Sequence, residues 1–568
     1  MPGRRSHRLP ARGLALPLAV ALVASSCASS TTPSRTIATP RAPAQSSAPI
    51  ASPQGQSGLP AGPGQPAGAS PSAPGAPGTP GQPAASGQPS AGRLPLAVVT
   101  GFANYRIDSV TAGTLATALS SGSLLVPCGA EAAVASALGV GAASGAAVPS
   151  SAASPAPCVP ATTITARLPS SSTALALMPP GLVTPAVRVV PIGVADPFGE
   201  TPARTAPYPL SIPVPPGWPA AWTAYDSSNV RVVLTTGVNC PDRGVSYQTN
   251  VRGRGWDWLL QAGTARYTGR HWDPQFGWWV VDAERTDHAG AMWALIRDAD
   301  VAVSDFECSM TPNFTQHDSG TDFTIDPKVA PLMAKAGFDV ATIAADHNTN
   351  PGLAAVPYTV KAFAANGIRA VGGGADLTQA LRPAVLDVRG IRFGFVGFDA
   401  IGGSASATAT SAGVAPLTPA DARIAISAAR AQGAQVVFAL PQWSSVEYRA
   451  AFTAFQDRLA AQLAAAGADE IIGADFHWAG ALSITPGGDA GYRLVTASQG
   501  NFWFGQSWSR QTQEAVMTML TFVGTRLAQV RLIPTVVLND AQPNLTDPAT
   551  DGQFVLHQVL SVSRLLEP

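Results

Sequence analysis

The chain has 568 residues, and its 35 lysine and arginine residues are balanced by 35 aspartate and glutamate residues. This balance argues against a nucleic-acid-binding protein that relies on bulk positive charge, so no nucleic-acid partner is expected. The length allows more than one domain, and the composition beyond residue 93 is ordinary for a globular protein.

The N-terminus has the pattern of an export signal over residues 1–27. A basic segment with Arg4 and Arg12 precedes an apolar segment, 14–24, that is too short to span a bilayer. The next residues resemble a bacterial lipobox that ends at Cys27, the predicted lipidation site, and simple cleavage is the alternative. We therefore predict an extracytoplasmic protein with a lipid anchor on the outer face of a bacterial plasma membrane, or a secreted one if the lipobox is not used.

A spacer and a small module are predicted next. Residues 28–93 consist almost wholly of Ala, Pro, Gly, Ser, Thr and Gln, which predicts a disordered linker. Residues 94–226 alternate predicted strands, such as 96–100 and 187–192, with a helix at 111–120. Their order resembles part of a phosphate-type periplasmic solute-binding domain, in which Ser and Thr could cradle an oxyanion; turn formation is the alternative role.

Four cysteines remain once Cys27 is set aside. Cys128 and Cys158 form a near pair, and Cys240 and Cys308 a more distant one, so the simplest disulfides join the members of each pair. The other two pairings stay open. The sequence contains no CxxC spacing, so a structural zinc site is not expected.

Residues 229–535 predict a larger α/β domain with a βαβ unit at its centre. A strand at 338–344, a helix at 356–366 and a strand at 368–371 follow one another, and Asp346-His347 come directly after the first strand. In open α/β sheets, sites form where strands end, so a carboxylate beside an imidazole there predicts a metal or acid–base site. A capped helix start with a surface histidine is the alternative.

The same pattern recurs along this domain, because polar residues follow other predicted strands at once. If these strand ends converge, they build a site for metal-assisted hydrolysis. The blocks "VSDFECSMT", "GFDVATIAADHNTNPG", "PQWSSVEY", "AAAGADEIIGADFHWAG" and "SQGNFWF" resemble, in order, those of the CapA family. These are capsule or poly-γ-glutamate biosynthesis proteins with a calcineurin-like metallophosphoesterase fold. The resemblance implies a β-sandwich of two mixed sheets flanked by helices, with the site at strand ends.

The resemblance also implies roles for single residues. The implied metal ligands are Glu307, Asp346, Gln442, Asp475 and His477, the implied catalytic acid is His347, and the implied substrate-binding residues are Asn501, Glu447 and Trp443. The family's Gly-Asp at the first strand end is here Gly237-Val238, and Gln442 stands where the family has a histidine. Asp305 is a further possible ligand. Hard oxygen ligands favour Mn, Mg or Ca over zinc, although a complete two-metal centre is not expected.

Two other features have open interpretations. Six tryptophans could line a groove for a polymer or sugar rings, although buried aromatic core is the favoured reading: Trp272, Trp278, Trp279, Trp443, Trp478 and Trp503. An amphipathic stretch, 554–566, in the predicted tail 536–568 is expected to dock on the domain. We predict a protein that acts on an anionic cell-envelope polymer. The alternatives are an inactive polymer-binding or anchoring protein on the same scaffold, and a solute sensor.

Overall fold

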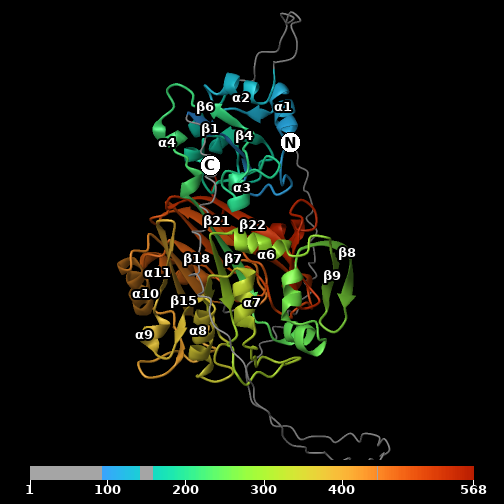
Figure 1. Cartoon of the computed structure of the whole chain (residues 1–568), viewed down its shortest axis with the longest axis vertical. Coiled ribbons are helices and arrows are strands. Elements are labelled where there is room, and N and C mark those ends of the chain that lie inside the picture. Colours follow the sequence, from blue (N-terminus) through green and yellow to red (C-terminus); the bar gives the residue numbers. More distant parts are fainter. Residues whose placement is uncertain (1–91, 141–157, 444–445, 568) are drawn as a thin grey trace, which may run out of the picture. The chain divides into compact units, whose positions relative to one another are not determined.

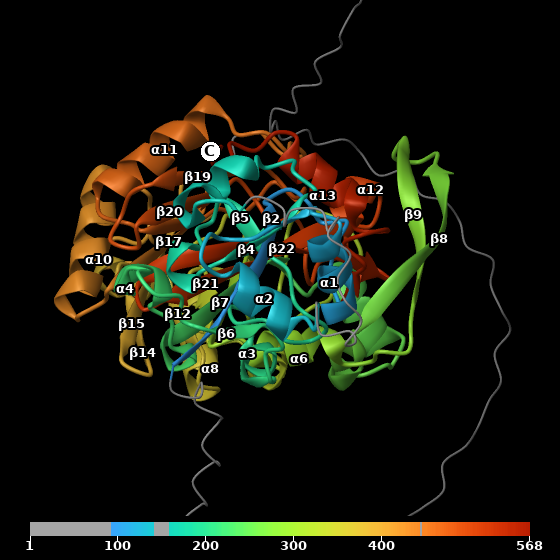
Figure 2. The same ribbon diagram turned by 90° about the horizontal axis from the view of Figure 1, so that it is seen from above.

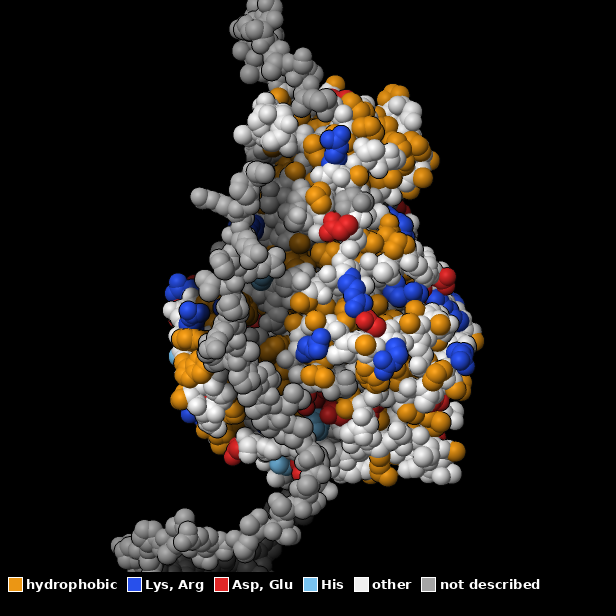
Figure 3. Space-filling model, turned by 180° about the vertical axis from the view of Figure 1, so that it is seen from behind, with side chains coloured by type: hydrophobic (Ala, Val, Ile, Leu, Met, Phe, Trp, Pro, Cys, Tyr) orange, Lys and Arg blue, Asp and Glu red, His pale blue; other side chains and the backbone are white. Residues whose placement is uncertain are grey.

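The computed structural model describes residues 92–140, 158–443 and 446–567, and every structural statement below refers to these. The predicted export signal, Cys27 and residues 28–91 of the predicted linker lie outside them. Within the part that is described, no helix has the length and apolar character needed to cross a membrane. On the face in Figure 3, Lys and Arg side chains lie among hydrophobic, acidic and uncharged side chains.

The N-terminal module is built on a small sheet, as predicted. Its four strands run in the order β3-β4-β2-β5, and a two-stranded sheet pairs β1 with β6. Helix α1 begins after Thr111, whose side chain accepts a hydrogen bond from the Thr114 N–H. Arg93, the last residue of the predicted linker, belongs to β1. The elements are β1 (Arg93–Pro95), β2 (Ala97–Gly101), α1 (Ala112–Ser120), β3 (Leu124–Leu125), β4 (Leu175–Met178), β5 (Val187–Val189) and β6 (Ser211–Pro213).

The main domain is a sandwich of two mixed sheets, which confirms the predicted α/β class. A nine-stranded sheet has the order β12-β11-β10-β7-β21-β22-β23-β8-β9, in which β21 spans Glu514–Val523. A six-stranded sheet has the order β14-β15-β17-β18-β20-β19, in which β14 spans Ala384–Val388 and β19 spans Leu482–Pro486. The strands that position the site are β7 (Val230–Asn239), β10 (Val301–Phe306), β11 (Val340–Thr342), β12 (Arg369–Val371), β15 (Ile391–Asp399), β17 (Val436–Gln442), β18 (Glu470–Ile472) and β20 (Tyr492–Thr496).

Because successive side chains of a strand point to opposite faces, each sheet has an inner and an outer face. The inner faces of the two sheets meet in one hydrophobic cluster that includes Val303 and Leu520 from one sheet and Phe395 and Phe438 from the other. Helices α6 (Ala291–Asp298), α7 (Val329–Ala336) and α8 (Ala355–Ala365) pack on the outer face of the larger sheet. Helices α10 (Pro419–Ala431) and α11 (Ala454–Ala465) cover the other sheet and lie side by side on one flank in Figures 1 and 2.

The predicted βαβ unit is confirmed, since β11 and β12 pair in parallel and α8 connects them. The sequence did not reveal the hairpin of β8 (Thr264–Asp273) and β9 (Trp278–Arg285), because most of its side chains are exposed and leave no buried alternation to detect.

The predicted boundary at residue 535 is wrong, because it falls inside β22 (Arg526–Leu538). The chain continues in the same sheet with β23 (Gln542–Thr546), which pairs with β22 and β8. Helix α13 (Gln553–Leu560) then buries Val555, Leu556 and Val559 in the cluster between the sheets, so the tail docks as predicted.

Both predicted disulfides are present. Cys128 bonds to Cys158 with their Cα atoms 4.8 Å apart, and Cys240 bonds to Cys308 with a Cα–Cα distance of 5.2 Å. The second bond joins the segment after β7 to the segment after β10, which are neighbouring parallel strands. It therefore fixes the sheet edge from which Glu307 projects.

Candidate metal and acid–base site

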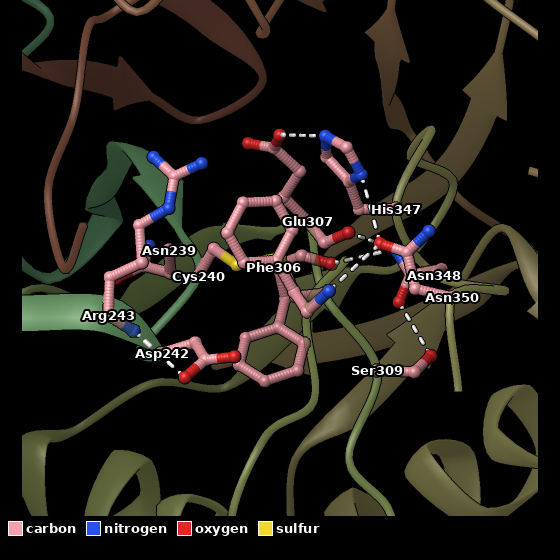
Figure 4. The surroundings of a disulfide bond; sticks show 12 residues. Asn239, Cys240, Asp242, Arg243, Phe306, Glu307, Ser309, His347, Asn348 and Asn350 are labelled. Atoms are coloured by element: carbon pink, nitrogen blue, oxygen red, sulfur yellow. Dashed lines mark hydrogen bonds and ion pairs between the residues drawn. A yellow bond between two sulfur atoms is a disulfide. The ribbon is translucent and has the colours of Figure 1, made fainter. Parts of the chain in front are cut away.

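Three of the predicted site residues converge at the ends of β10 and β11. One ligand atom from each of Glu307, Asp346 and His347 lies within 4.8 Å of the other two. His347 Nε2 is 3.8 Å from Glu307 Oε1 and 3.5 Å from Asp346 Oδ2. Figure 4 shows Glu307 and His347 pointing toward one another. Two carboxylates and an imidazole therefore meet at one point, as expected from parallel strands that end at the same edge.

The orientation of the His347 ring follows from its neighbour Asn350. Asn350 Oδ1 lies 3.0 Å from His347 Nδ1 and also accepts a hydrogen bond from the Phe323 N–H. Because that amide atom acts as an acceptor, His347 Nδ1 carries the hydrogen that it donates. In the neutral ring, Nε2 then keeps its lone pair, and this lone pair faces the two carboxylates. It can bind a cation or accept a proton.

The carboxylates of the cluster are buried without enough partners. Glu307 Oε2, Asp346 Oδ1 and both carboxylate oxygens of Asp305 accept no hydrogen bond from the residues that the structure describes. Burial, followed by the charges of Asp346 and Asp475, raises the pKa of Glu307 well above its ordinary value. Burial and Asp346 raise the pKa of Asp305 to about 7. The cluster therefore gathers acidic groups whose ionised forms the surrounding residues do not stabilise.

Asp475 and Glu447 extend the cluster to the surface. They line a cleft of about 450 Å³ together with Asp346, Ile401 and Phe455. Asp475 has a backbone φ of 109°, a conformation that residues other than glycine rarely adopt. Strain of this kind persists only where the surrounding structure imposes it, and it concentrates at functional sites. The predicted ligand Asp475 and the predicted substrate contact Glu447 thus lie on one cleft with Asp346.

Gln442 contacts the backbone of Asp346. Its Oε1 accepts a hydrogen bond of 2.5 Å from the Asp346 N–H. The atom left buried without a partner among the described residues is Nε2, which donates hydrogen bonds and cannot coordinate a cation. This geometry gives Gln442 a hydrogen-bonding role, and its predicted role as a metal ligand stays a prediction. Gln442 positions Asp346 and offers a donor to an anionic group.

His477 is held beside the cluster by Asn501. His477 Nδ1 lies 2.9 Å from Asn501 Oδ1, while Asn501 Nδ2 donates to the Thr512 carbonyl oxygen. Burial lowers the pKa of His477 to about 4, so the ring is neutral at neutral pH. Asn501 is fully buried and holds His477, and its predicted contact with substrate stays a prediction.

Trp443 departs from its predicted role. It is fully buried in the cluster under α10 and α11, and its indole N–H donates to the Ala497 carbonyl oxygen. The alternative of a buried core tryptophan is correct here. It is also correct for Trp503, which packs on Trp293 with ring centroids 5.0 Å apart.

Two residues near the site escaped the sequence analysis. In Figure 4 the Arg243 guanidinium lies on the same side as the Glu307 carboxylate, and the guanidinium stacks on Phe323 at 4.7 Å. Tyr448 hydrogen-bonds Glu447, and burial raises the pKa of the Tyr448 hydroxyl. Both residues come a few positions after the end of a predicted strand. The search for polar residues after strand ends, which identified Glu307 and Asp346, could therefore have identified them too. Both also have positive φ angles, 43° for Arg243 and 58° for Tyr448, which sequence does not reveal.

The sequence around the candidate site is similar to that of known proteins. Residues 253–506 match the family model described as "Bacterial capsule synthesis protein PGA_cap". The "Capsule biosynthesis protein CapA" of Bacillus anthracis is 26% identical over 251 residues, which are 44% of this chain and 59% of that protein. The "PGA biosynthesis protein CapA" of Bacillus subtilis (strain 168) is 26% identical over 227 residues, 39% of this chain and 58% of that one. The chain thus spans less than two thirds of either relative.

A solved structure, the calcineurin-like phosphoesterase YfkN from Bacillus subtilis, is 13% identical, with 58% of this chain and 97% of that chain covered. The TM-score of the two structures is 0.27. The family match begins at residue 253 and leaves the N-terminal module untested, so its resemblance to solute-binding domains stays a prediction. Over residues 253–506, the resemblance of this chain to the CapA family of capsule biosynthesis proteins is confirmed.

Proposed function

We propose that this protein acts on an anionic cell-envelope polymer through a metal-assisted site formed by Glu307, Asp346 and His347. The supporting observation is the convergence of their ligand atoms within 4.8 Å, with buried carboxylate oxygens that lack partners among the described residues. The relatives are named for capsule and PGA biosynthesis, which suggests poly-γ-glutamate or a related polymer as the substrate. An export signal and a lipid anchor at Cys27 would place the protein in the envelope.

The residues present fit a divalent cation. Glu307, Asp346 and Asp475 would hold it, because hard carboxylate oxygens suit Mn²⁺, Mg²⁺ or Ca²⁺, and Asp305 lies close enough to raise the pKa of Glu307. A bound cation would also offset the repulsion among these buried acids. When bound, it would supply Lewis-acid polarisation of the scissile phosphoester or amide.

The protein's own groups would then handle protons and orientation. His347 Nε2 is placed to take a proton from the attacking water and return it to the leaving group, since Asn350 holds the other ring nitrogen. The buried Gln442 Nε2 and the Arg243 guanidinium are donors beside the cluster that would bind anionic oxygens of the substrate.

The second candidate is an inactive polymer-binding or anchoring protein on the same scaffold. It is favoured by Gly237-Val238 in place of the family's Gly-Asp and by Gln442 in place of a histidine. Both changes reduce the number of ligands available to a second metal ion.

Metal content separates the two candidates. The purified protein, loaded with Mn²⁺ and desalted, is expected to retain about one ion per chain and to hydrolyse bis(p-nitrophenyl) phosphate. Glu307→Gln and Asp346→Asn should each weaken Mn²⁺ binding by at least about tenfold. Asp387→Asn, which removes an exposed carboxylate paired with Arg392, is the matched control. Undiminished Mn²⁺ binding in both site variants would refute the proposed site, while polymer binding without metal would favour the second candidate.

A further inference from the structure

The β8–β9 hairpin exposes an unusual amount of aromatic surface. Trp272 is 51% exposed, Phe276 49%, Trp278 37% and Trp279 46%. In Figures 1 and 2 the hairpin stands out at the side of the domain. Large apolar side chains that gather on an exposed element mark a binding surface more often than chance exposure. These tryptophans therefore differ from Trp443 and Trp503, which belong to the core.

One face of the hairpin forms an open aromatic platform. Trp272 and Trp279 are opposite each other in the β8–β9 register, with ring centroids 5.7 Å apart. The exposed Arg270 lies 4.7 Å from the centre of the Trp279 ring. A groove of about 370 Å³ separates this platform from Arg510 and Phe554. The groove combines flat rings with positive charge.

The other aromatic residues of the hairpin lead toward the candidate site. Phe276 and Trp278 contact Trp508, with ring centroids 5.8 and 6.3 Å apart. Trp508 contacts Tyr448 at 4.9 Å, and Tyr448 lies 5.9 Å from the ring of His477. Trp478, half-buried, bridges Trp278 and Tyr448 at 5.7 and 6.4 Å. Tyr448 also hydrogen-bonds Glu447 at the acidic cleft, so ring contacts connect the hairpin with that cleft.

We propose that this hairpin binds the sugar rings of an acidic envelope polysaccharide. Sugar rings stack on exposed aromatic faces through their C–H groups, and successive rings along a glycan need several such faces in a row. Arg270 complements the carboxylate of an acidic sugar. This binding goes beyond the function proposed above and does not require a working site.

A γ-glutamyl chain fits less well, because it has carboxylates but no rings, so it would use Arg270 and leave the tryptophan faces empty. A membrane surface is the other occupant to be distinguished, and vesicle binding tests it.

The test measures binding of a hyaluronan octasaccharide, an acidic alternating glycan, to the full chain by calorimetry. Trp279→Ala and the double variant Trp272→Ala/Trp279→Ala are expected to weaken binding by about tenfold and by about a hundredfold. Arg270→Gln should weaken binding of this glycan but not of neutral chitohexaose. Ile424→Ala, which shortens an exposed side chain on α10, is the matched control and should bind as wild type.

Hydrolysis of bis(p-nitrophenyl) phosphate, where it is present, should not change in the hairpin variants, since they leave the cleft intact. The proposal is overturned if the wild type binds neither glycan, or if the hairpin variants bind the octasaccharide as tightly as wild type. It is also overturned if the tryptophan substitutions weaken poly-γ-glutamate binding equally, or if they abolish binding to phosphatidylglycerol vesicles while no glycan binds.

Discussion

Asp242 and Glu307 are two buried carboxylates on either side of the Cys240–Cys308 disulfide, and their surroundings are opposite (Figure 4). Asp242 accepts five hydrogen bonds, from three backbone N–H groups, the Ser246 hydroxyl and the His317 ring. Glu307 has an oxygen without any partner among the described residues, and other carboxylates raise its pKa. The two carboxylates are therefore equally buried, but Asp242 stabilises the fold through its hydrogen bonds, while Glu307 remains available to a ligand.

Replacement of Asp242 should have the largest effect on stability. Asp242→Ala leaves several buried donors without an acceptor, so we expect the free energy of unfolding to fall by about 5 kcal/mol. Urea denaturation followed by tryptophan fluorescence measures this change. Asp242→Asn keeps part of the acceptor capacity and should fall between this variant and wild type. An alanine variant as stable as wild type would remove the contrast between the two carboxylates.

Loss of the disulfide between them should rank second. The double variant Cys240→Ser/Cys308→Ser opens a loop with a sequence separation of 68 residues. We expect the free energy of unfolding to fall by about 4 kcal/mol, because the unfolded chain regains conformational freedom. Differential scanning calorimetry detects the shift. Removal of the other bridge, Cys128–Cys158, with a separation of only 30, should cost less, and the reverse order would contradict the loop-length argument.

Asp196 in the N-terminal module lies between Asp242 and Glu307 in how well its carboxylate is hydrogen-bonded. It predicts that stability depends on pH. It is buried and accepts a hydrogen bond from the Phe198 N–H, yet burial raises its pKa to about 6. The folded protein therefore holds this proton to higher pH than the unfolded chain, and stability falls as pH rises from about 4 to about 6. Asp196→Asn should lack this loss and exceed wild type at pH 7 by up to about 3 kcal/mol.

Urea titrations of wild type and Asp196→Asn at pH 4.5 and 7 measure this difference. The gap should be small at the lower pH and larger at the higher one. An equal gap at both would show that the carboxyl group does not ionise in this interval.

The smallest change in stability is expected for Glu307→Gln. The substitution removes a charge that burial and neighbouring acids disfavour, so the free energy of unfolding should rise by about 1 kcal/mol. Mn²⁺ binding should fall at the same time, as described above. Chemical denaturation without metal measures the first effect, and Glu284→Gln on the exposed hairpin serves as the control. A loss of 2 kcal/mol or more would mean that Glu307 supports the fold as Asp242 does.

The sequence predicted the scaffold better than the site. The βαβ unit around Asp346 could be read from apolar runs and turn residues, and spacing favoured the two cysteine pairings while leaving the other two open. The roles of Gln442, Asn501 and Trp443 could not be read, because each depends on which atom of a side chain is already engaged by a distant partner. The β8–β9 hairpin was missed since its aromatic residues face outward, where no core periodicity marks a strand.

The packing of β7 limits what a substitution at Val238 could add to the candidate site. A Cβ atom added at Gly237 would stand 2.0 Å from the Gly500 carbonyl oxygen, and the Val238 side chain packs in the hydrophobic cluster beneath the helices. An aspartate substituted for Val238 would enter that apolar layer and not the acidic cleft. A single Val238→Asp substitution would thus not add a carboxylate to the cleft, and directed evolution toward a second metal position must begin from another strand.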